Sequence, residues 1–340
     1  MSIILDAMGS DDRPAPELQA AVDAARLYQE EIILVGDEAV LKPRLAALNP
    51  GSLPVSIVHA PEAVDMSDHI EDVRKKKDNS MRVGMDLVKS GKGACFVTAG
   101  NTGMAMYFAV KTFRNIHGVI RPALTTLFPV KGGHCIVCDI GANAECTPEY
   151  LLQFATMGSI YAEKILNIKN PRIGLLANGE EAGKGNELVK GTYPLLQGSG
   201  LNFIGNVEGK EVFNGDADVV VTDGFTGNIM LKSTEAVAKL IVDTLKENLM
   251  GSFRTKLGAL LARPAFDGVK KLIDPSEVGA APLLGVDGLV FIGHGRSNAK
   301  AMTSALRVAH QANEAHLLDA LREAVQTRLA DMAHSQPEQP

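Results

Sequence analysis

The chain has 340 residues, of which 46% are hydrophobic and 22% charged, and its formal net charge is -6 at pH 7. These values are typical of a globular enzyme that is long enough to bury a sizeable core. The acidic balance, with no Trp and only five Tyr, argues against a general nucleic-acid binder, which needs a basic face and stacking platforms.

The sequence also predicts the compartment. Its apolar runs end well before the roughly 20 residues that a membrane-spanning helix needs, and no cationic segment with a long apolar core opens the chain. Both features favour a cytoplasmic protein, in which we expect the four cysteines to form no disulfide framework. Cys135 and Cys138 have CxxC spacing, but residues three apart on a strand point to opposite faces, so we expect no shared metal.

Six short apolar runs are each followed by a loop rich in Gly, Asn, Asp and Glu. The runs begin at Ile3, Ala94, Cys135, Ile173, Val219 and Val290. A run of strand length, a small polar loop and then a helical pattern are typical of a βα unit in a buried parallel sheet. We therefore predict an α/β fold whose loops converge beyond the carboxyl ends of the strands, where such sheets bind ligands.

The segments between these runs continue the alternation of strand and helix. In chain order they predict helices over 20–28, near 41–48 and over 81–89, strands over 32–35 and 55–59, and a final helix over 299–332. Four consecutive cations, Arg74 to Lys77, precede the helix that begins at Met81. The end of the chain is rich in Pro and Gln, and we expect residues 333–340 to be disordered.

The region over 234–275 departs from this alternation. An apolar face with helical spacing covers residues 234–249. A second apolar stretch with interleaved cations follows, and its large side chains are Phe253, Leu257, Leu260 and Leu261. We expect a pair of helices that project from the sheet with a basic and apolar tip. Two interpretations fit the tip: a contact in a dimer, or shallow docking on an anionic membrane surface.

The loop at 100–103 follows a predicted strand and precedes a predicted helix. Backbone N–H groups at that helix start can face an anion, and Thr102 adds a hydroxyl group. Gly100, Asn101 and Gly103 complete this candidate site for a phosphate or a carboxylate, which needs no metal. The alternative is an ordinary helix cap, because Asn and Thr are common cap residues.

The loop at 178–185 places two acids and a lysine among three glycines. The Lys184 ammonium group can neutralise phosphate, or the oxyanion that forms when a carbonyl is attacked, with Glu180 and Glu181 close to it in the loop. The alternative is a solvated loop with a surface ion pair. Neither standard nucleotide-binding motif is complete. The loop at 178–185 does not have the spacing of a P-loop, and the loop at 293–298 lacks the third glycine of GxGxxG.

Two further loops carry candidate groups. Asp223 and Thr226 lead to Asn228, whose amide stays neutral at any pH and is suited to polarising a carbonyl. His294 lies between two glycines and fits either acid–base transfer or a bond to the backbone.

Asp6, Asp139 and Asn143 follow predicted strands in the same way. They fit either a divalent cation or the capping of glycine-rich turns. The loops contain no GxSxG elbow, no His-spaced zinc motif and no glycine-flanked cysteine, which argues against the common covalent hydrolases and metallohydrolases. Direct transfer to a bound anion is the simplest chemistry that remains.

Nine motifs lie in order between Ile3 and about Ala312: LDAMGSD, RKKKDNSM, AGNTG, DIGAN, GEEAGKG, GNVEGKE, DGFTGN, GAAPLLGVDG and HGRSN. Each motif alone is weak, but the ordered set resembles the phosphate acyltransferase family of bacterial phospholipid synthesis. The chain departs from the family pattern at Ser10, Asn79, Asn178 and Arg296.

The resemblance implies a three-layer α/β/α fold with a mostly parallel sheet, similar to phosphotransacetylases and isocitrate dehydrogenases. We expect one catalytic domain over 1–332. The implied reaction transfers a long-chain acyl group from acyl-acyl-carrier-protein to inorganic phosphate, giving acyl phosphate, with no cofactor and no metal. The implied partners are a second copy of the chain and a membrane-bound glycerol-3-phosphate acyltransferase, which would place the protein at the inner face of the membrane.

For that reaction we expect Lys184 to orient phosphate or stabilise the oxyanion, and Asn228 to donate to the thioester oxygen. His294 completes the expected catalytic set. The expected substrate-binding residues are Asp6, Gly9, Gly100, Asn101, Thr102, Gly103, Asp139, Asn143, Glu180, Glu181, Asp223 and Thr226.

The carrier protein of this family is acidic, so a basic docking face is needed. The candidates are Arg74, Lys75, Lys76, Lys77, Arg263, Lys270 and Lys271, although each group also fits an ordinary solvated face. The apolar tip can also accept the acyl chain. Three other functions remain as alternatives: a phosphotransacetylase-type enzyme that uses acyl-CoA, a nicotinamide-dependent dehydrogenase, and a non-catalytic membrane adaptor.

Overall fold

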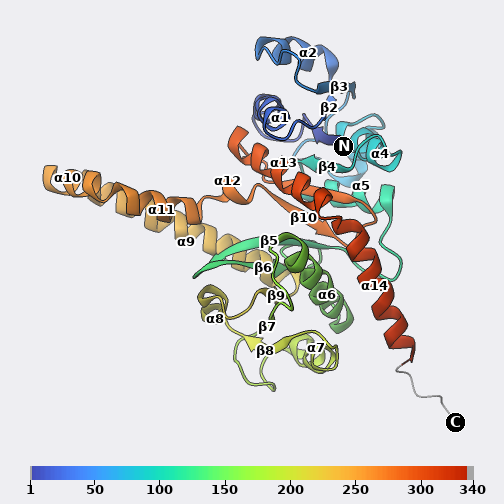
Figure 1. Cartoon of the computed structure of the whole chain (residues 1–340), viewed down its shortest axis with the longest axis vertical. Coiled ribbons are helices and arrows are strands. Elements are labelled where there is room, and N and C mark those ends of the chain that lie inside the picture. The colour runs from blue at the N-terminus through green and yellow to red at the C-terminus, as the bar shows by residue number, and fades with distance from the viewer. Residues whose placement is uncertain (1, 335–340) are drawn as a thin grey trace.

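The computed structural model describes residues 2–334 (Figure 1). The side chains of Lys270, Lys271, Ile273 and Pro275, and those of residues 328–334, lie outside the description. The side chains of two expected docking residues, Lys270 and Lys271, therefore fall outside what the structure describes. Disorder was expected over residues 333–340: residues 333–334 belong to the last helix, which corrects the expectation there, and residues 335–340 lie outside the described residues.

Eleven strands of the described chain form one sheet in the order β3-β2-β1-β4-β11-β10-β5-β6-β9-β7-β8. Their bounds are β1 (Ile3–Asp6), β2 (Ile32–Gly36), β3 (Val55–His59), β4 (Cys95–Thr98), β5 (Ala123–Val130), β6 (Gly133–Cys138), β7 (Ile173–Leu176), β8 (Phe203–Val207), β9 (Val219–Val221), β10 (Ala280–Leu284) and β11 (Leu289–Gly293). All six apolar runs lie on strands, and the predicted strands at 32–35 and 55–59 are β2 and β3, so these predictions are confirmed.

The sheet has two parallel halves that run in opposite directions. The strands from β3 to β11 pair in parallel, and so do the strands from β6 to β8. Between the halves, the pairings β11–β10, β10–β5 and β5–β6 are all antiparallel, which reverses the direction. The glycine-rich loops therefore form two groups, one at the carboxyl ends of each half, instead of the single row that was expected.

The twist of the sheet turns these two groups toward each other. Five steps separate β4 from β9 in the strand order, and a rotation of roughly 20–25° per step adds up to roughly 100°. Because of this rotation, the carboxyl ends of the two halves do not point in opposite directions, although the strands of the two halves are antiparallel in the pairing order. The two groups meet where α9 (Gly224–Met250), which follows β9, contacts the loop after β11 through Lys232 and His294. Figure 1 shows α9 leaving the body of the molecule.

Helices cover both faces of the sheet. One face carries α1 (Ala15–Tyr28), α6 (Pro148–Ile165), α7 (Glu187–Gln197), α13 (Ala299–Glu314) and α14 (Leu317–His334), and the other carries α4 (Ser80–Lys89), α5 (Thr102–Phe113) and α8 (Gly209–Asn214). Side chains alternate along each strand, so Leu5 packs in the first core and Ile4 in the second. Cys138 and Cys135 likewise belong to different cores, as their spacing predicted. The three-layer arrangement is confirmed.

Two predicted helices have different bounds in the structure. α1 begins at Ala15, before the predicted start, because proline is tolerated in the first turn, where the N–H group has no helical partner. The prediction of one helix over 299–332 is wrong, because His316 has φ of 51° and separates α13 from α14. Outside the arm described next, the remaining helices of the described chain are α2 (Glu38–Ala47), α3 (Ile70–Val73) and α12 (Pro275–Val278).

An arm projects from the body (Figure 1) and consists of α9, α10 (Phe253–Leu261) and α11 (Arg263–Ile273). The sequence predicted two helices here and the structure has three, because a cap at Ser252 starts α10 and Ala262 separates it from α11. The predicted apolar tip is exposed: 81% of Phe253 and 77% of Leu261 face solvent. Within the described chain, no helix has both the length and the apolar character to cross a bilayer.

Candidate active site

Asp6 is the buried carboxylate beside the first group of loops. It ends β1 and is completely buried. Its carboxylate accepts hydrogen bonds from Thr98 Oγ1 at 2.8 Å and from the Met8 N–H group at 3.0 Å. Burial raises the pKa of Asp6, and these hydrogen bonds oppose the rise only in part. Gly9 and Gly100 pack against each other beside it, since a Cβ on Gly9 would lie 2.9 Å from Gly100 N. Asp6 thus holds two glycine loops together and faces no solvent.

The start of α5 combines a cap with an open anion site. Asn101 Oδ1 accepts from the Met104 N–H group at 3.1 Å, and Asn101 Nδ2 donates to Met66 O at 3.0 Å. Thr102 and Gly103 are exposed, and their N–H groups take part in no hydrogen bond between described residues. The two sequence interpretations therefore apply to different residues: Asn101 caps the helix, and Thr102 and Gly103 can face an anion.

Asp139 accepts hydrogen bonds from several backbone N–H groups in the second group of loops. Its Oδ1 accepts from the N–H groups of Leu124, Gly141 and Ala142 at 3.0–3.1 Å. Its Oδ2 accepts from the N–H group of Asn143 at 2.7 Å and from the Asn143 side-chain amide at 2.9 Å. The residue is completely buried, and burial raises its pKa. Asp139 and Asn143 fit the capping interpretation, because the carboxylate oxygens already accept these donors.

The first turn of α9 packs directly on Asp139 and the loop that follows it. Asp223 caps the helix, accepting from the Thr226 N–H group and from Thr226 Oγ1, both at 2.8 Å. A Cβ on Gly227 would overlap the carbonyl oxygen of Asp139. Glycine at this position is therefore what allows α9 to start beside the loop after β6.

The loop at 178–185 lies at the same edge, because β7 is the parallel neighbour of β9. Lys184, Glu180 and Glu181 are exposed. Lys210 Nζ lies 2.9 Å from Glu180 Oε1, and Asn206 Nδ2 donates to Glu181 O at 2.9 Å. The loop is thus held by one contact from β8, through Asn206, and one from α8, through Lys210. Lys184 makes no ion pair with any described residue, so its ammonium group is available to a ligand.

Asn228 and Lys232 lie where the second group of loops contacts the first. They are one turn apart on α9 and share a face of the helix. Asn228 is exposed beside Gly141, where a Cβ would lie 3.9 Å from the Asn228 side chain. Lys232 Nζ lies 3.3 Å from Nε2 of His294, which follows β11 in the other half of the sheet. The His294 ring therefore contacts a side chain, not the backbone as one interpretation expected.

A hollow lies beside the second group. This open depression of about 490 Å³ is lined by Arg121, Ala142, Asn143, Glu145, Cys146, Thr147 and Tyr150. Burial raises the pKa of Cys146 to about 11, so the thiol is uncharged at neutral pH and a poor nucleophile. The hollow gives a substrate room next to Asn143 without offering a cysteine for covalent chemistry.

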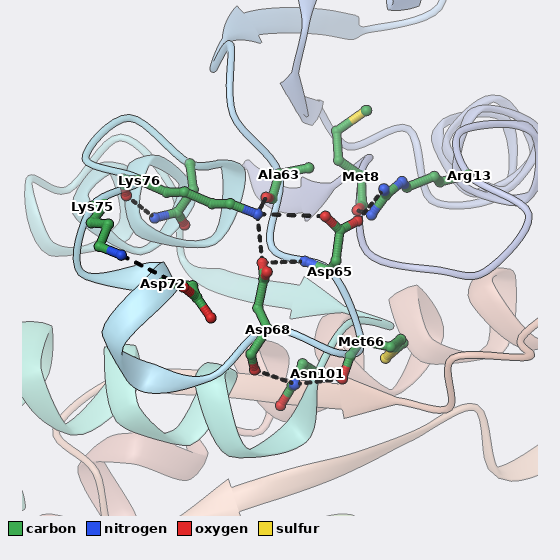
Figure 2. Close-up of polar contacts among 11 residues, drawn as sticks. Met8, Arg13, Ala63, Asp65, Met66, Asp68, Asp72, Lys75, Lys76 and Asn101 are labelled. Carbon is green, nitrogen blue, oxygen red and sulfur yellow. Dashed lines mark hydrogen bonds and ion pairs between the residues drawn. The ribbon is translucent and has the colours of Figure 1, made fainter.

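The predicted docking cations differ in availability. Arg74, Lys75 and Lys77 are exposed, and so is Arg263. Lys76 is only 26% exposed and forms ion pairs with the carboxylates of Asp65 and Asp68 (Figure 2). Lys76 is therefore engaged inside the protein, unlike its neighbours.

Two clusters within the described chain bring metal-ligating atoms together. They are Glu30, His310 and Glu314, and Glu180, Glu208 and Glu211. In the second cluster Lys210 Nζ lies 2.9–3.2 Å from all three carboxylates, so an ammonium group already supplies the positive charge there. Neither cluster includes Asp6 or Asp139.

Sequence reasoning gave no role to Lys232 or Lys210. A signal existed for Lys232, since it lies four residues after Asn228 on a predicted helix and therefore on the same face. Lys210 belongs to the motif GNVEGKE, but nothing in the spacing of that motif indicates that it reaches the loop at 178–185.

The fold and the two groups of glycine-rich loops define an α/β enzyme with the architecture of phosphotransacetylases. The chain is similar to EutD phosphotransacetylase from Staphylococcus aureus, with a TM-score of 0.59, 16% identity and coverage of 96% of this chain and 94% of the other. A branched-chain phosphotransacylase from Enterococcus faecalis V583 gives a TM-score of 0.57 at 14% identity, covering 92% of this chain and 99% of the other. The expected likeness to phosphotransacetylases is confirmed at the level of fold, and that to isocitrate dehydrogenases stays a prediction.

The sequence places the chain within a family. A family model described as "Fatty acid synthesis protein" matches residues 1–319. The phosphate acyltransferase of Elusimicrobium minutum is 48% identical over 311 residues, which are 91% of each chain. That of Pelotomaculum thermopropionicum is 45% identical over 328 residues, which are 96% of each chain. The chain belongs to this family of phosphate acyltransferases and is an acyltransferase.

Proposed function

We propose that the protein transfers a long-chain acyl group from the thioester of acyl-acyl-carrier-protein to inorganic phosphate, with acyl phosphate as the product. The observation that supports this most directly is the contact between Lys232 and His294, which joins the loops of the two halves. One half offers the open start of α5, which suits an anion, and the other offers the exposed amide of Asn228, which suits a carbonyl. The names of the relatives support phosphate as the acceptor.

Phosphate binds at the start of α5 in this proposal. The N–H groups of Thr102 and Gly103 and the Thr102 hydroxyl donate to its oxygens, and the helix dipole adds to the attraction. Phosphate is already largely dianionic at neutral pH, so it needs positioning more than it needs a strong base.

The thioester carbonyl binds against α9. Asn228 donates to the carbonyl oxygen, and the ammonium group of Lys184 stabilises the negative charge that develops on it. A phosphate oxygen forms the new bond to the carbonyl carbon. The tetrahedral intermediate then breaks its C–S bond, and the electron pair leaves with sulfur as a thiolate, which takes a proton from water. No enzyme-bound acyl intermediate is needed.

The exposed cations Arg74, Lys75, Lys77 and Arg263 are the proposed docking face for the acidic carrier protein. Because these residues are exposed, the attraction should weaken as ionic strength rises. This part of the proposal is tested by measuring the Michaelis constant for the acylated carrier at increasing salt concentrations. A Michaelis constant that does not change with salt would count against it.

The arm is the proposed contact with a membrane or with a second copy of the chain. Exposed apolar side chains on α9, such as Leu240 at 65%, suit a homodimer, whereas those of α10, with Arg254 and Lys256 between them, suit an anionic membrane surface. Peripheral attachment at the inner face of the membrane would let the protein hand its poorly soluble product to a membrane-bound glycerol-3-phosphate acyltransferase.

The experiment that tests the reaction is the release of free carrier thiol from acyl-acyl-carrier-protein. The release should depend on inorganic phosphate, and acyl phosphate should form in equal amount. Acyl-CoA serves as the comparison donor, because the fold is shared with phosphotransacetylases. Equal or better use of acyl-CoA would favour that alternative, and thiol release without phosphate would exclude the proposed acceptor.

A further inference from the structure

A tight turn over residues 65–68 covers the first group of loops (Figure 2). The Asp68 N–H group donates to Asp65 O at 3.1 Å, and the Asp65 N–H group donates to Asp68 Oδ2 at 2.8 Å. Met66 and Ser67 form the tip of the turn, and both are exposed. The two aspartates thus close the turn on itself and present Met66 to the neighbouring loops.

The tip contacts two of the glycine-rich loops of this half, those after β4 and β11. Met66 O accepts from Asn101 Nδ2 at 3.0 Å, and Asp68 O lies 3.5 Å from the same nitrogen. The Met66 side chain packs on the loop after β11, since a Cβ on Gly295 would lie 2.5 Å from Met66 Cε. The turn therefore fixes Asn101, the cap of α5, relative to the loop that carries His294.

Two cations hold the turn in place. Lys76 Nζ donates to Ala63 O at 2.8 Å and lies 2.5 Å from Asp68 Oδ2 and 3.5 Å from Asp65 Oδ2. Arg13 forms an ion pair of 2.5 Å with Asp65. Through its other nitrogen, Arg13 also donates to Met8 O at 3.0 Å, within the loop that follows β1. Together with the contacts to Asn101 and Gly295, these bonds tie the turn to four parts of the chain that carry motifs.

We propose that Lys76 is a positioning residue for phosphate: it holds the 65–68 turn against Asn101 and thereby fixes the open start of α5. This inference rests on the proposed function, since it takes phosphate as the anion bound there. It assigns Lys76 a different role from the neighbouring cations, which remain the proposed docking face for the carrier protein.

The charges around Lys76 support this division. Arg13 and Lys76 face Asp65 and Asp68, so the cluster has two positive and two negative groups and offers an acidic partner no net attraction. The Lys75 side chain is 80% exposed, against 26% for Lys76, and the ion pair that Lys75 forms with Asp72 is long at 3.8 Å. To dock a carrier, Lys76 would have to leave two carboxylates and a carbonyl oxygen.

The test compares Lys76→Met with Lys75→Met, a neighbour that makes no contact with the turn. Kinetics are measured with phosphate and acylated carrier varied separately. Lys76→Met should raise KM for phosphate by about tenfold and leave KM for the carrier near the wild-type value, whereas Lys75→Met should leave KM for phosphate unchanged. Lys76→Arg, which keeps the charge, should recover most of the phosphate affinity.

Asp68→Asn distinguishes a positioning role from a docking role, because the two roles predict different changes in binding. Removing a negative charge from a docking face should tighten carrier binding, whereas loosening the turn should raise KM for phosphate in the same direction as Lys76→Met. Calorimetric titration of each variant with phosphate alone provides a second measurement that needs no acyl donor. It also replaces the kinetic test if Lys76→Met folds poorly, because Asp68→Asn and Lys76→Arg make smaller changes.

The outcomes separate this inference from the proposed function. A wild-type protein that shows no phosphate-dependent thiol release contradicts the proposed function. If the wild-type protein is active and both Lys76→Met and Asp68→Asn keep normal phosphate KM and phosphate affinity, the positioning role is excluded. A rise in carrier KM shared equally by Lys75→Met and Lys76→Met would return Lys76 to the docking face.

Discussion

Lys232 on α9 lies 3.3 Å from Nε2 of His294 at the end of β11. The two residues belong to halves of the sheet that run in opposite directions, and their contact joins the loops of one half to those of the other. It also places the face of α9 that carries Asn228 toward the first group of loops.

We expect Lys232→Met to lower turnover by about tenfold, because it removes the contact with His294, and loss of a hydrogen bond made by a charged group costs roughly 1.5 kcal/mol or more. The variant also removes the ion pair between Lys232 and Glu235, at 2.9 Å on the same helix. Steady-state kinetics at saturating phosphate measure the effect. Lys239→Met, at an exposed position further along α9, is the control and should behave as wild type. Equal losses in both variants would show that charge on the helix matters and the contact with His294 does not.

Lys184→Met and Asn228→Ala should each lower turnover by on the order of 10²-fold, because in the proposed mechanism both groups stabilise the oxyanion. Phosphate-dependent thiol release measures the loss. Lys190→Met removes an exposed lysine from α7, the helix that follows the loop at 178–185, and should have little effect. Near-normal turnover in a folded Lys184→Met or Asn228→Ala variant would remove that residue from the mechanism.

Gly227→Ala should destabilise the protein by about 1–3 kcal/mol, because the added Cβ overlaps the backbone oxygen of Asp139, which cannot move aside as a side chain would. Urea denaturation gives the free energy of unfolding. Gly258→Ala in α10 is the matched control: its Cβ would have no neighbour within 4 Å, so the higher helix propensity of Ala should leave stability unchanged or raise it by up to about 1 kcal/mol. A neutral Gly227→Ala would contradict the close packing of α9 on the Asp139 loop.

Leu257→Glu and Leu260→Glu should abolish flotation of the protein with anionic vesicles, if the arm is the membrane contact. The control is Leu27→Glu, which introduces the same charge at an apolar residue that is 65% exposed on α1. Vesicle binding that survives in the two arm variants would exclude the tip as the attachment site, and sedimentation equilibrium would then ask whether the arm serves a dimer.

The turn at 65–68 should loosen in acid. The hydrogen bond from Arg13 holds the pKa of Asp65 below its usual value of 3.8. A carboxyl whose pKa is lowered by folding adds stability above its unfolded pKa, and this is lost as the pH falls through the folded value. The difference in unfolding free energy between wild type and Asp65→Asn should therefore be constant above about pH 5 and shrink below about pH 4. A difference that grows toward acid pH would contradict the ion pair.

Much of the fold follows from local patterns. The apolar runs predict their strands because a buried parallel strand needs an uninterrupted apolar stretch, and the loops after them are recognisable from glycine and small polar residues. The reversal of direction between the halves was not predicted. The pairs β5–β6 and β10–β11 are local hairpins, but the pairing of β10 with β5, which joins Leu283 to Leu124, is long-range and is not indicated by local patterns. The division of the chain into a single catalytic domain stays a prediction.

The site divides in the same way. Asn101 was recognised as a possible cap because a cap is a local feature, read from the residues that follow it. Asp223 was expected to bind substrate, and the structure shows that it caps α9. Lys76 was assigned to a docking face from its place in a run of four cations, yet its partners Asp65 and Asp68 come from a loop whose path the sequence does not reveal. Charge runs predict exposure on average, and one member of this run is turned inward.

α9 is unbroken from Asn228 to Met250 and carries few buried side chains beyond its first turn. A helix of this kind behaves as a stiff rod that pivots where it is clamped, here at Gly227 against Asp139. In the proposed mechanism, any tilt imposed on the far end of the arm, by a bilayer or by another subunit, would therefore change the angle at which the Asn228 amide meets the thioester.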